Sequence, residues 1–183
     1  MAIEIRIAIM DDCPAITQLM AESARVLGKP GYTDDEIDAA LQSAWGLDTQ
    51  LVRDSTYFLV YLDSELAACG GWSFRKTLFG SDAEGSRDAA RLDPATDAAR
   101  IRAFFVRPKF ARQGLGSMIM RRCEQDAGEA GFRSLALGAT LPGQRLYAAH
   151  GFVASEPIDY DLGNGLSMQV IPMTKSLDES GLE

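Results

Sequence analysis

The residues that usually build metal centres and disulfides are scarce in this sequence, which has three cysteines and one histidine among 183 residues. Cys13, Cys69 and Cys123 lie far apart and lack metal-ligand spacing. His150 alone does not complete a zinc site of any usual pattern. We therefore expect no metal ion, and three reduced thiols buried in the core.

Long apolar runs and an excess of positive charge are also missing. No stretch approaches the ~20 uninterrupted apolar residues that a membrane helix requires, and the N-terminus has no basic segment followed by an apolar run. The net charge of −8 argues against a nucleic-acid partner, because duplex binding normally requires a basic surface. We expect a cytoplasmic protein with no membrane or nucleic-acid partner, and the sequence leaves open whether it forms a homodimer.

Length and composition indicate a single domain. With 46% apolar and 24% charged residues, the chain has the composition of an ordinary globular protein. Its length fits one hydrophobic core, and a second independent core would be hard to accommodate. We expect this domain to span residues 1–177 and to be followed by a short C-terminal tail, 178–183.

Hydrophobic periodicity predicts a mixed α/β fold, with a mixed sheet and helices on both of its faces. Ile3–Ile9 has the alternation of a half-buried strand, and Thr33–Glu36 has the residue types of a capping box, opening a helix to about Trp45. Further strands are expected at Tyr57–Leu62, Leu66–Ser73 and Arg100–Val106, from Ser134, from Gly151, and at Met168–Lys175 after a turn at Asn164 and Gly165. Further helices are expected after a cap at Asp11 or Asp12, over Gly114–Ala130 and over Pro142–His150.

One stretch, Phe79–Ala99, shows no clear period and is rich in Gly, Ser, Asp and Ala. No second domain follows it, so we interpret it as a long excursion or mobile flap rather than as a linker.

The most informative segment is Phe104–Ser117, in which an apolar strand ends before a proline and a basic, glycine-containing turn leads directly into a helix. The first N–H groups of a helix have no partner within it, and the helix dipole adds about half a positive charge there. Gly114 and Gly116 let an anion approach the backbone without a Cβ in the way, and Arg112 adds charge and donors. The segment is a predicted phosphate site, with an ordinary strand–turn–helix connection as the alternative.

Two common phosphate motifs do not fit this segment. A P-loop requires Lys and then Ser or Thr after its second glycine, whereas Ser117 and Met118 follow Gly116. A dinucleotide fingerprint requires a third glycine where this sequence has Ile119. The segment instead resembles the coenzyme A-binding motif of the GCN5-related N-acetyltransferase (GNAT) superfamily, Gln/Arg-x-x-Gly-x-Gly/Ala after a strand ending in Val-x-Pro. Ala111 stands at the first position of that pattern and departs from it.

A second segment strengthens the resemblance. Leu146–Phe152 matches the family's Leu-Tyr-x-x-x-Gly-Phe, about 30 residues after the glycine turn. Together with the opening strand and the acidic start of the first helix, the resemblance covers most of Ile3–Leu177. It implies a GNAT-like fold, with a mostly antiparallel twisted sheet between helices, and an enzyme that takes acetyl-CoA as acyl donor.

The resemblance also implies roles for individual residues. Tyr147 would be the general acid, since a departing thiol of pKa about 8.5 leaves more readily when a tyrosine hydroxyl of pKa about 10 protonates it. Packing at a helix end is the alternative role for this tyrosine. In the family, the strand equivalent to Phe104–Val106 splays from its neighbour and offers backbone groups to the pantetheine arm and the thioester oxygen. The predicted cofactor-binding residues are Phe104, Phe105, Val106, Arg112, Gln113, Gly114, Leu115, Gly116 and Ser117.

Other parts of the family pattern are missing. Relatives often have an asparagine seven residues before the tyrosine, where this sequence has Thr140. The central strand contains no acid, so the general base is unassigned, with Glu65, Glu156 and Asp159 as weak candidates. His150 lies in the variable part of its motif, and we expect it on an exposed helix end rather than in catalysis.

The acceptor site is poorly specified by the sequence. By resemblance, its walls would come from Gly28–Tyr32 and from the final hairpin, Tyr160–Gly165. Tyr32, Tyr160 and Asp161 are candidates to line it, and the flap Phe79–Ala99 is a candidate to close over it.

We therefore predict an N-acetyltransferase that moves an acetyl group from acetyl-CoA to a primary amine of a small molecule or peptide. The amine attacks the thioester directly in a ternary complex. One alternative is a coenzyme A-binding module or sensor without turnover, which the unassigned base and Thr140 favour. The other is an anion site for a different ligand on an α/β fold.

Overall fold

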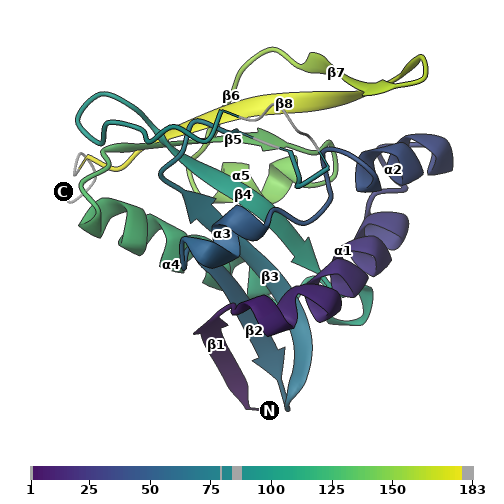
Figure 1. The fold of residues 1–183 in the computed structure, drawn as a ribbon, viewed down its shortest axis with the longest axis horizontal. Helices are drawn as coiled ribbons and strands as arrows, with labels where there is room; N and C mark the ends of the chain where they lie inside the picture. Colours follow the sequence, from purple (N-terminus) through teal and green to yellow (C-terminus); the bar gives the residue numbers. More distant parts are fainter. Residues whose placement is uncertain (1, 79, 84–87, 179–183) are drawn as a thin grey trace.

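A twisted mixed sheet forms the centre of the structure, a computed structural model that describes residues 2–78, 80–83 and 88–178 (Figure 1). The strands are ordered β1-β2-β3-β4-β5-β8-β6, and β7 also pairs with β8. β4 and β5 run parallel, whereas the other pairs are antiparallel. The strands are β1 (Ile3–Ile7), β2 (Tyr57–Leu62), β3 (Glu65–Ser73), β4 (Ala99–Val106), β5 (Ser134–Ala139), β6 (Val153–Ala154), β7 (Ile158–Gly163) and β8 (Leu166–Ser176).

Helices cover both faces of the sheet, which confirms the predicted mixed α/β fold. The α-helices are α1 (Cys13–Leu27), α2 (Asp34–Leu41), α3 (Thr49–Arg53), α4 (Leu115–Glu129) and α5 (Gln144–Ala149), with short 3-10 turns η1 (Met10–Asp12) and η2 (Pro108–Phe110). β2 contacts both layers. Phe58 and Val60 pack in the cluster that includes α4, whereas Tyr57 and Leu59 pack in the cluster with α1 and α3. This explains why β2 is an uninterrupted apolar run.

A third cluster connects the end of α1 and α2 to the hairpin of β7 and β8. It contains Tyr32 and Ile37 beside Met168 and Val170. The hairpin closes through Asn164 and Gly165, whose positive φ angles of 53° and 76° suit the predicted two-residue turn. The hairpin therefore places Met168 and Val170 of β8 against α1 and α2.

Some element boundaries differ from those expected. The capping box is confirmed, because Thr33 Oγ1 accepts from the Glu36 N–H at 3.3 Å and the Glu36 carboxylate accepts from the Thr33 N–H at 2.7 Å. The helix ends at Leu41 rather than near Trp45, because the Trp45 N–H donates to the Ala40 carbonyl at 2.7 Å and turns the chain back.

The predicted acidic cap of the first helix was also wrong in its detail. The Asp12 carboxylate does not cap α1. It accepts from the Ile9 N–H at 2.8 Å and pairs with Arg6 at 2.7 Å. These two contacts hold the turn that connects the end of β1, at Ile7, to the helix.

Helix α3 was not expected from the sequence. It begins at an N-cap, where the Asp48 carboxylate accepts from the Gln50 N–H at 3.0 Å. Five residues are too few to show helical periodicity, so the cap was the available signal.

The predicted flap is partly packed against the rest of the fold where it is described, in residues 80–83 and 88–99. Leu92 lies in the main core and its N–H donates to the Phe74 carbonyl at 2.8 Å. The Asp82 N–H donates to the Leu47 carbonyl at 2.9 Å. Residues 79 and 84–87 lie outside the described part of the chain, as do 179–183 of the predicted tail, so a mobile flap stays a prediction.

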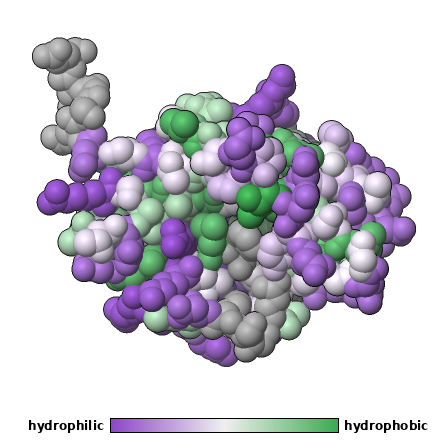
Figure 2. Space-filling view, turned by 90° about the horizontal axis from the view of Figure 1, so that it is seen from above, coloured by the Kyte–Doolittle hydropathy of each residue, from purple (hydrophilic) through white to green (hydrophobic). Residues whose placement is uncertain are grey.

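The cysteines are unpaired, and Cys69 and Cys123 are buried as expected. Cys13 is only half-buried, because it opens α1 at the edge of its cluster. None of the described helices has the length and apolar character needed to cross a membrane. In the view of Figure 2 most side chains are hydrophilic, and apolar ones gather towards the middle of the face.

Candidate acyl-transfer site

The central strands β4 and β5 separate soon after they meet. They pair only at Ala99 with Leu135 and at Arg100 with Ala136, near the start of each strand. Beyond these pairs, residues 101–106 and 137–138 line a shared cavity. The sequence-based expectation of a strand that splays from its neighbour therefore agrees with the observed pairing. The opening leaves backbone groups of a central strand accessible to a ligand.

A β-bulge shapes the open part of β4. Cys69 pairs with Phe105 and Gly71 with Arg102, so that Ala103 and Phe104 together lie opposite Gly70. Ala103 has a φ of 55°, which costs a non-glycine residue about 1–2 kcal/mol.

Two buried contacts hold this bulge. The Tyr57 hydroxyl donates to the Ala103 carbonyl at 2.7 Å. A Cβ on Gly70 would lie 2.5 Å from the Phe104 ring, so glycine leaves the space into which that ring turns. Tyr57 and Gly70 thus fix the strand that forms one wall of the cavity.

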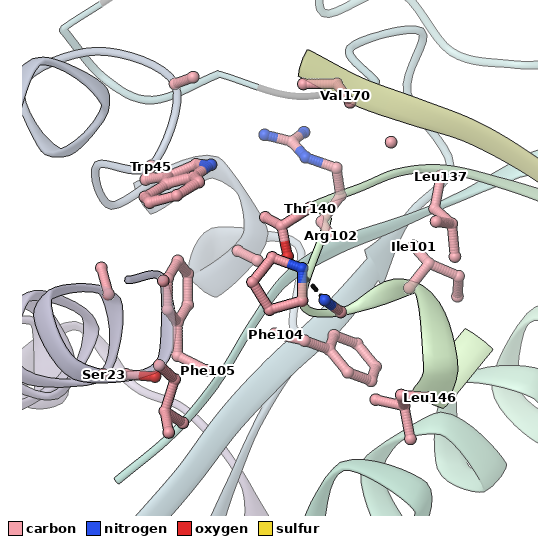
Figure 3. A pocket seen from close by; sticks show the side chains of 18 of the residues that line it. Ser23, Trp45, Ile101, Arg102, Phe104, Phe105, Leu137, Thr140, Leu146 and Val170 are labelled. Carbon is pink, nitrogen blue, oxygen red and sulfur yellow. Dashed lines mark hydrogen bonds between the residues drawn. The ribbon is translucent and has the colours of Figure 1, made fainter. Parts of the chain in front are cut away.

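The cavity between the strands has a volume of about 260 Å³. In Figure 3, Trp45 and Phe105 lie on one side of it and Leu137 and Leu146 on the other, with Phe104 between them. The walls come from β4, β5 and α5, from the start of α4, from the end of α1, from the turn after α2, and from β8. Segments distant in sequence therefore meet at the point where the sheet opens.

The glycine turn lies at the start of α4. Gly114 has a φ of 81°, and a Cβ built there would meet no atom within 4 Å, so its backbone is open to a ligand. The first helical bond runs from the Met118 N–H to the Gly114 carbonyl at 3.0 Å. The N–H groups of residues 115–117 precede it and have no partner within the helix. This end of α4 can hold an anion.

The predicted cofactor-binding residues fall into two groups. Phe104, Phe105, Val106 and Gly116 line the cavity, and Tyr147 lines it as well. Arg112, Gln113, Gly114, Leu115 and Ser117 belong to the turn and the first turn of α4, outside the cavity wall. Leu115 packs into the core, so only its backbone is available. The residues of the turn and of the first turn of α4 would contact a ligand only if it extends from the cavity to the start of α4.

The Val106 N–H is already engaged. It donates to Ser23 Oγ of α1 at 3.3 Å, and Ser23 is a buried residue of the cavity wall. A ligand can accept a hydrogen bond from this N–H only if the Ser23 hydroxyl moves away. The hydroxyl also contributes a polar group to the cavity wall. Ser23 was not predicted, because a lone serine on an amphipathic helix carries no local signal of a binding role.

Tyr147 packs between two phenylalanine rings, with ring centroids 6.1 Å from Phe104 and 6.0 Å from Phe152. Burial, with a smaller effect of the nearby Cys123, raises the pKa of Tyr147 well above its usual value. Within the described part of the chain, its hydroxyl has no hydrogen-bond partner. The side chain is half-buried and lines the cavity, so its hydroxyl can donate to a ligand there.

Several other candidates do not reach the cavity. Glu65 pairs with Lys109 at 2.7 Å, and Glu156 and Asp159 are exposed. His150 is the C-cap of α5, as expected for a helix end, but only 13% of its side chain is exposed. Its ring lies 3.8 Å from the Glu124 carboxylate. Burial lowers the pKa of His150.

Thr140 is both a cavity residue and a strand-end residue. It follows β5 directly, and its hydroxyl accepts from the Gly143 N–H at 3.1 Å, which holds the turn into α5.

Only one of the three predicted acceptor-site residues lines the cavity. Tyr160 does, and Asp161 instead accepts from the Gly163 N–H at 2.8 Å in its own hairpin. Tyr32 is buried, donates to the Gln169 carbonyl at 2.6 Å and accepts from the Leu141 N–H at 2.9 Å. Its ring packs edge-on against Trp45 at 5.5 Å, and Trp45 does line the cavity. Tyr32 thus supports the wall from behind.

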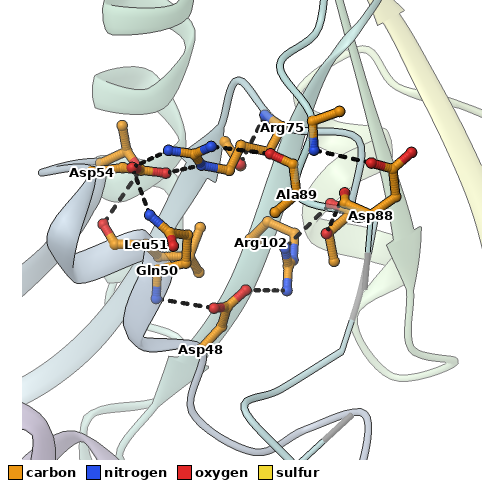
Figure 4. A network of polar contacts seen from close by, with 12 residues as sticks. Asp48, Gln50, Leu51, Asp54, Arg75, Asp88, Ala89 and Arg102 are labelled. Atoms are coloured by element: carbon orange, nitrogen blue, oxygen red, sulfur yellow. Dashed lines mark hydrogen bonds and ion pairs between the residues drawn. The ribbon is translucent and has the colours of Figure 1, made fainter. Parts of the chain in front are cut away.

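A buried ion pair was missed by the sequence analysis. Arg102 of β4 lines the cavity and pairs with Asp48 at 3.1 Å, and both side chains are at most 4% exposed. Arg102 also donates to the carbonyls of Gly80, at 2.8 Å, and Thr77, at 3.2 Å. In the network of Figure 4, Asp54 binds Arg75 at 2.6 Å close by. The residues are distant in sequence, so no local pattern signals their pairing.

The splayed parallel pair, the glycine turn and the tyrosine of α5 thus lie around one opening of the sheet. Comparison with known proteins shows the family. Residues 14–152 match the model of the acetyltransferase (GNAT) family. The chain belongs to this family and is an N-acetyltransferase-type enzyme. No curated protein sequence matches it as a relative.

Solved structures share the fold at low sequence identity. A GCN5-related N-acetyltransferase from Rhodopseudomonas palustris is 16% identical with a TM-score of 0.70, and 96% of each chain is covered. The PaiA N-acetyltransferase from Thermoplasma acidophilum, in complex with coenzyme A, is 14% identical with a TM-score of 0.64, covering 96% of this chain and 99% of that one. The putative acetyltransferase YncA from Salmonella typhimurium, with acetyl-CoA, is 16% identical with a TM-score of 0.64, covering 100% and 98%.

Proposed function

We propose that the protein transfers the acetyl group of acetyl-CoA to a primary amine by direct attack in a ternary complex. The observation that carries this proposal is the opening between β4 and β5. The cavity in this opening borders unpaired backbone of β4 and reaches the start of α4, where the first N–H groups can hold an anion. Two of the similar structures were determined with coenzyme A or acetyl-CoA, which supports this choice of donor.

The donor would lie across the two groups of predicted residues. Its pyrophosphate would meet the backbone N–H groups of residues 112–117, helped by the charge of Arg112. Its pantetheine arm would follow Phe104–Val106 in the opening, where backbone donors and acceptors of β4 are available. The thioester would then lie in the cavity near Tyr147.

The chemistry requires one bond to form and one to break. The neutral amine attacks the thioester carbonyl, forming a C–N bond and an oxyanion that a backbone N–H of the opened β4 stabilises. Collapse of this intermediate breaks the C–S bond, and the Tyr147 hydroxyl gives its proton to the departing sulfur. The amine nitrogen loses a proton to solvent, and the tyrosinate takes a proton back from solvent, which restores Tyr147 for the next turnover. The Tyr147 hydroxyl is protonated at neutral pH, and burial, which raises its pKa, keeps it protonated in more alkaline solution as well.

Two measurements test the proposal together. Release of free thiol from acetyl-CoA is followed with a panel of primary amines, and binding of coenzyme A is followed by calorimetry. Amine-dependent thiol release is the expected result. Binding without thiol release for any amine would favour the non-catalytic coenzyme A module. Absence of binding at millimolar coenzyme A would contradict the donor assignment altogether.

Variants at Gly114, the residue before α4, and at Gly128 within α4 make the binding test specific. Gly114→Ala places a Cβ on a backbone with φ of 81° at the proposed phosphate site, so it should weaken coenzyme A binding about 10-fold. Gly128→Ala on the same helix also meets no atom within 4 Å, and binding to it should be unchanged.

A further inference from the structure

The two ends of the cavity differ in their lining. Towards α4 and α5 the wall includes Gly116, Leu137 and Tyr147, which the proposed function assigns to the donor. On the opposite side the wall is built by α1, the turn after α2, the segment after β3, β7 and β8. Its apolar and aromatic members are Leu27, Trp45, Leu78, Tyr160, Met168 and Val170. An amine that reaches the thioester from this side passes between these side chains.

The shape of this acceptor end is held by packing. Trp45 rests against Tyr32, whose hydroxyl is fixed by two backbone hydrogen bonds of 2.6 and 2.9 Å. Met168 and Val170 stand on β8, in the cluster that contains Tyr32. Ligand pockets that are preformed in this way bind without a large ordering cost.

The charged groups at this end of the cavity are paired with each other. Arg102 is part of the wall, and its guanidinium extends between Trp45 and Val170 in the view of Figure 3. Its pairing with Asp48 at 3.1 Å balances the charge and directs the carboxylate to the guanidinium. A second ammonium group of a substrate would lose its hydration among apolar side chains, and the Asp48 carboxylate is already bound to a guanidinium.

Resting on the proposed function, we propose that the acceptor is a primary amine attached to an apolar aliphatic or aromatic group, with no second positive charge. The apolar group contacts Trp45, Met168 and Val170, and the amino group points to the thioester beside Tyr147. Polyamines and other dications are poor acceptors, even though the protein carries a net charge of −8 that attracts them.

A matched pair of amines tests this proposal on the unmodified protein. n-Hexylamine and cadaverine have the same length, and they differ only in a methyl or an ammonium group at the far end. Under conditions of saturating acetyl-CoA, kcat/KM for n-hexylamine should exceed that for cadaverine by about 100-fold. Equal values, or a preference for cadaverine, would overturn the proposal while leaving acetyl transfer intact. If n-hexylamine, cadaverine and phenethylamine gave no thiol release while another amine of the panel did, this proposal alone would be overturned. If no amine of the panel gave thiol release, the proposed function would be overturned with it.

Variants of Trp45 test the position of the apolar group. Trp45→Ala should lower kcat/KM for phenethylamine about 10- to 100-fold and leave kcat/KM for ethylamine within about 2-fold. Trp45→Phe, which keeps an aromatic wall, should retain most of the activity with phenethylamine. An equal loss with both amines would mean that Trp45 supports the fold rather than the substrate, and it would contradict the proposed contact.

Discussion

The role of Tyr147 can be tested by removing one oxygen atom. In Tyr147→Phe the ring keeps its contacts with Phe104 and Phe152, at centroid distances of 6.1 and 6.0 Å. The hydroxyl has no hydrogen-bond partner within the described part of the chain, so its removal leaves no protein group unpaired there. The free energy of unfolding should therefore change by less than about 0.5 kcal/mol.

The expected loss is catalytic. A positioned general acid contributes about 100- to 10,000-fold to the rate, or roughly 3–5 kcal/mol of barrier. kcat for acetyl transfer should fall by that factor, while the calorimetric affinity for coenzyme A stays within about 2-fold. Thiol release under saturating substrates measures the first quantity, and thermal unfolding checks that the variant is folded.

The pH dependence gives a second view of the same group. Because burial raises the pKa of Tyr147, its acid form persists well above neutral pH, and the wild-type rate should not decline up to about pH 9. A Tyr147→Phe variant with unchanged kcat would refute the assignment. A wild-type rate that falls between about pH 7 and 9 would refute the protonation argument.

Three further predictions concern the bulge, the ion pair of Arg6 with Asp12, and the capping box. Tyr57→Phe leaves the Ala103 carbonyl without its 2.7 Å donor and should lower the free energy of unfolding by about 1–3 kcal/mol in urea titration; no change would mean that the bulge does not need this bond. Hydrogen bonds from Arg6 lower the pKa of Asp12, so its stabilising effect should be present above about pH 4 and disappear as pH falls further, and Asp12→Asn should flatten the acid limb of stability against pH. Thr33→Ala removes the cap of α2 and should cost about 1 kcal/mol by the same titration, whereas an unchanged midpoint would show that the cap is dispensable.

The sequence was informative where local chemistry decides the structure. The capping box at Thr33, the turn at Asn164 and the glycine turn before α4 each depend on a few neighbouring residues, and each was identified. The alternation of apolar residues likewise located most strands. Boundaries were less accurate, as at the end of α2, where the turn of Trp45 towards Ala40 depends on the contact of its ring with Tyr32.

What the sequence did not predict comes from long-range packing. Ser23 binds the Val106 N–H across 83 positions, and Arg102 binds Asp48 across 54. The bulge at Ala103 has no local signature, because its cause is a tyrosine hydroxyl on another strand. Tyr32 was predicted to line the acceptor site, but it does not line the cavity and instead packs against Trp45, which does.

The central claim is that acetyl-CoA occupies the opening between β4 and β5 with its phosphates at the start of α4. Backbone amide NMR during titration with acetyl-CoA tests it residue by residue. We expect the largest shifts at Phe104–Val106 and at residues 112–117, and little change at Asn164 and Gly165 in the distant hairpin turn. Saturable binding that leaves the amides of residues 104–106 and 112–117 unshifted would contradict the account.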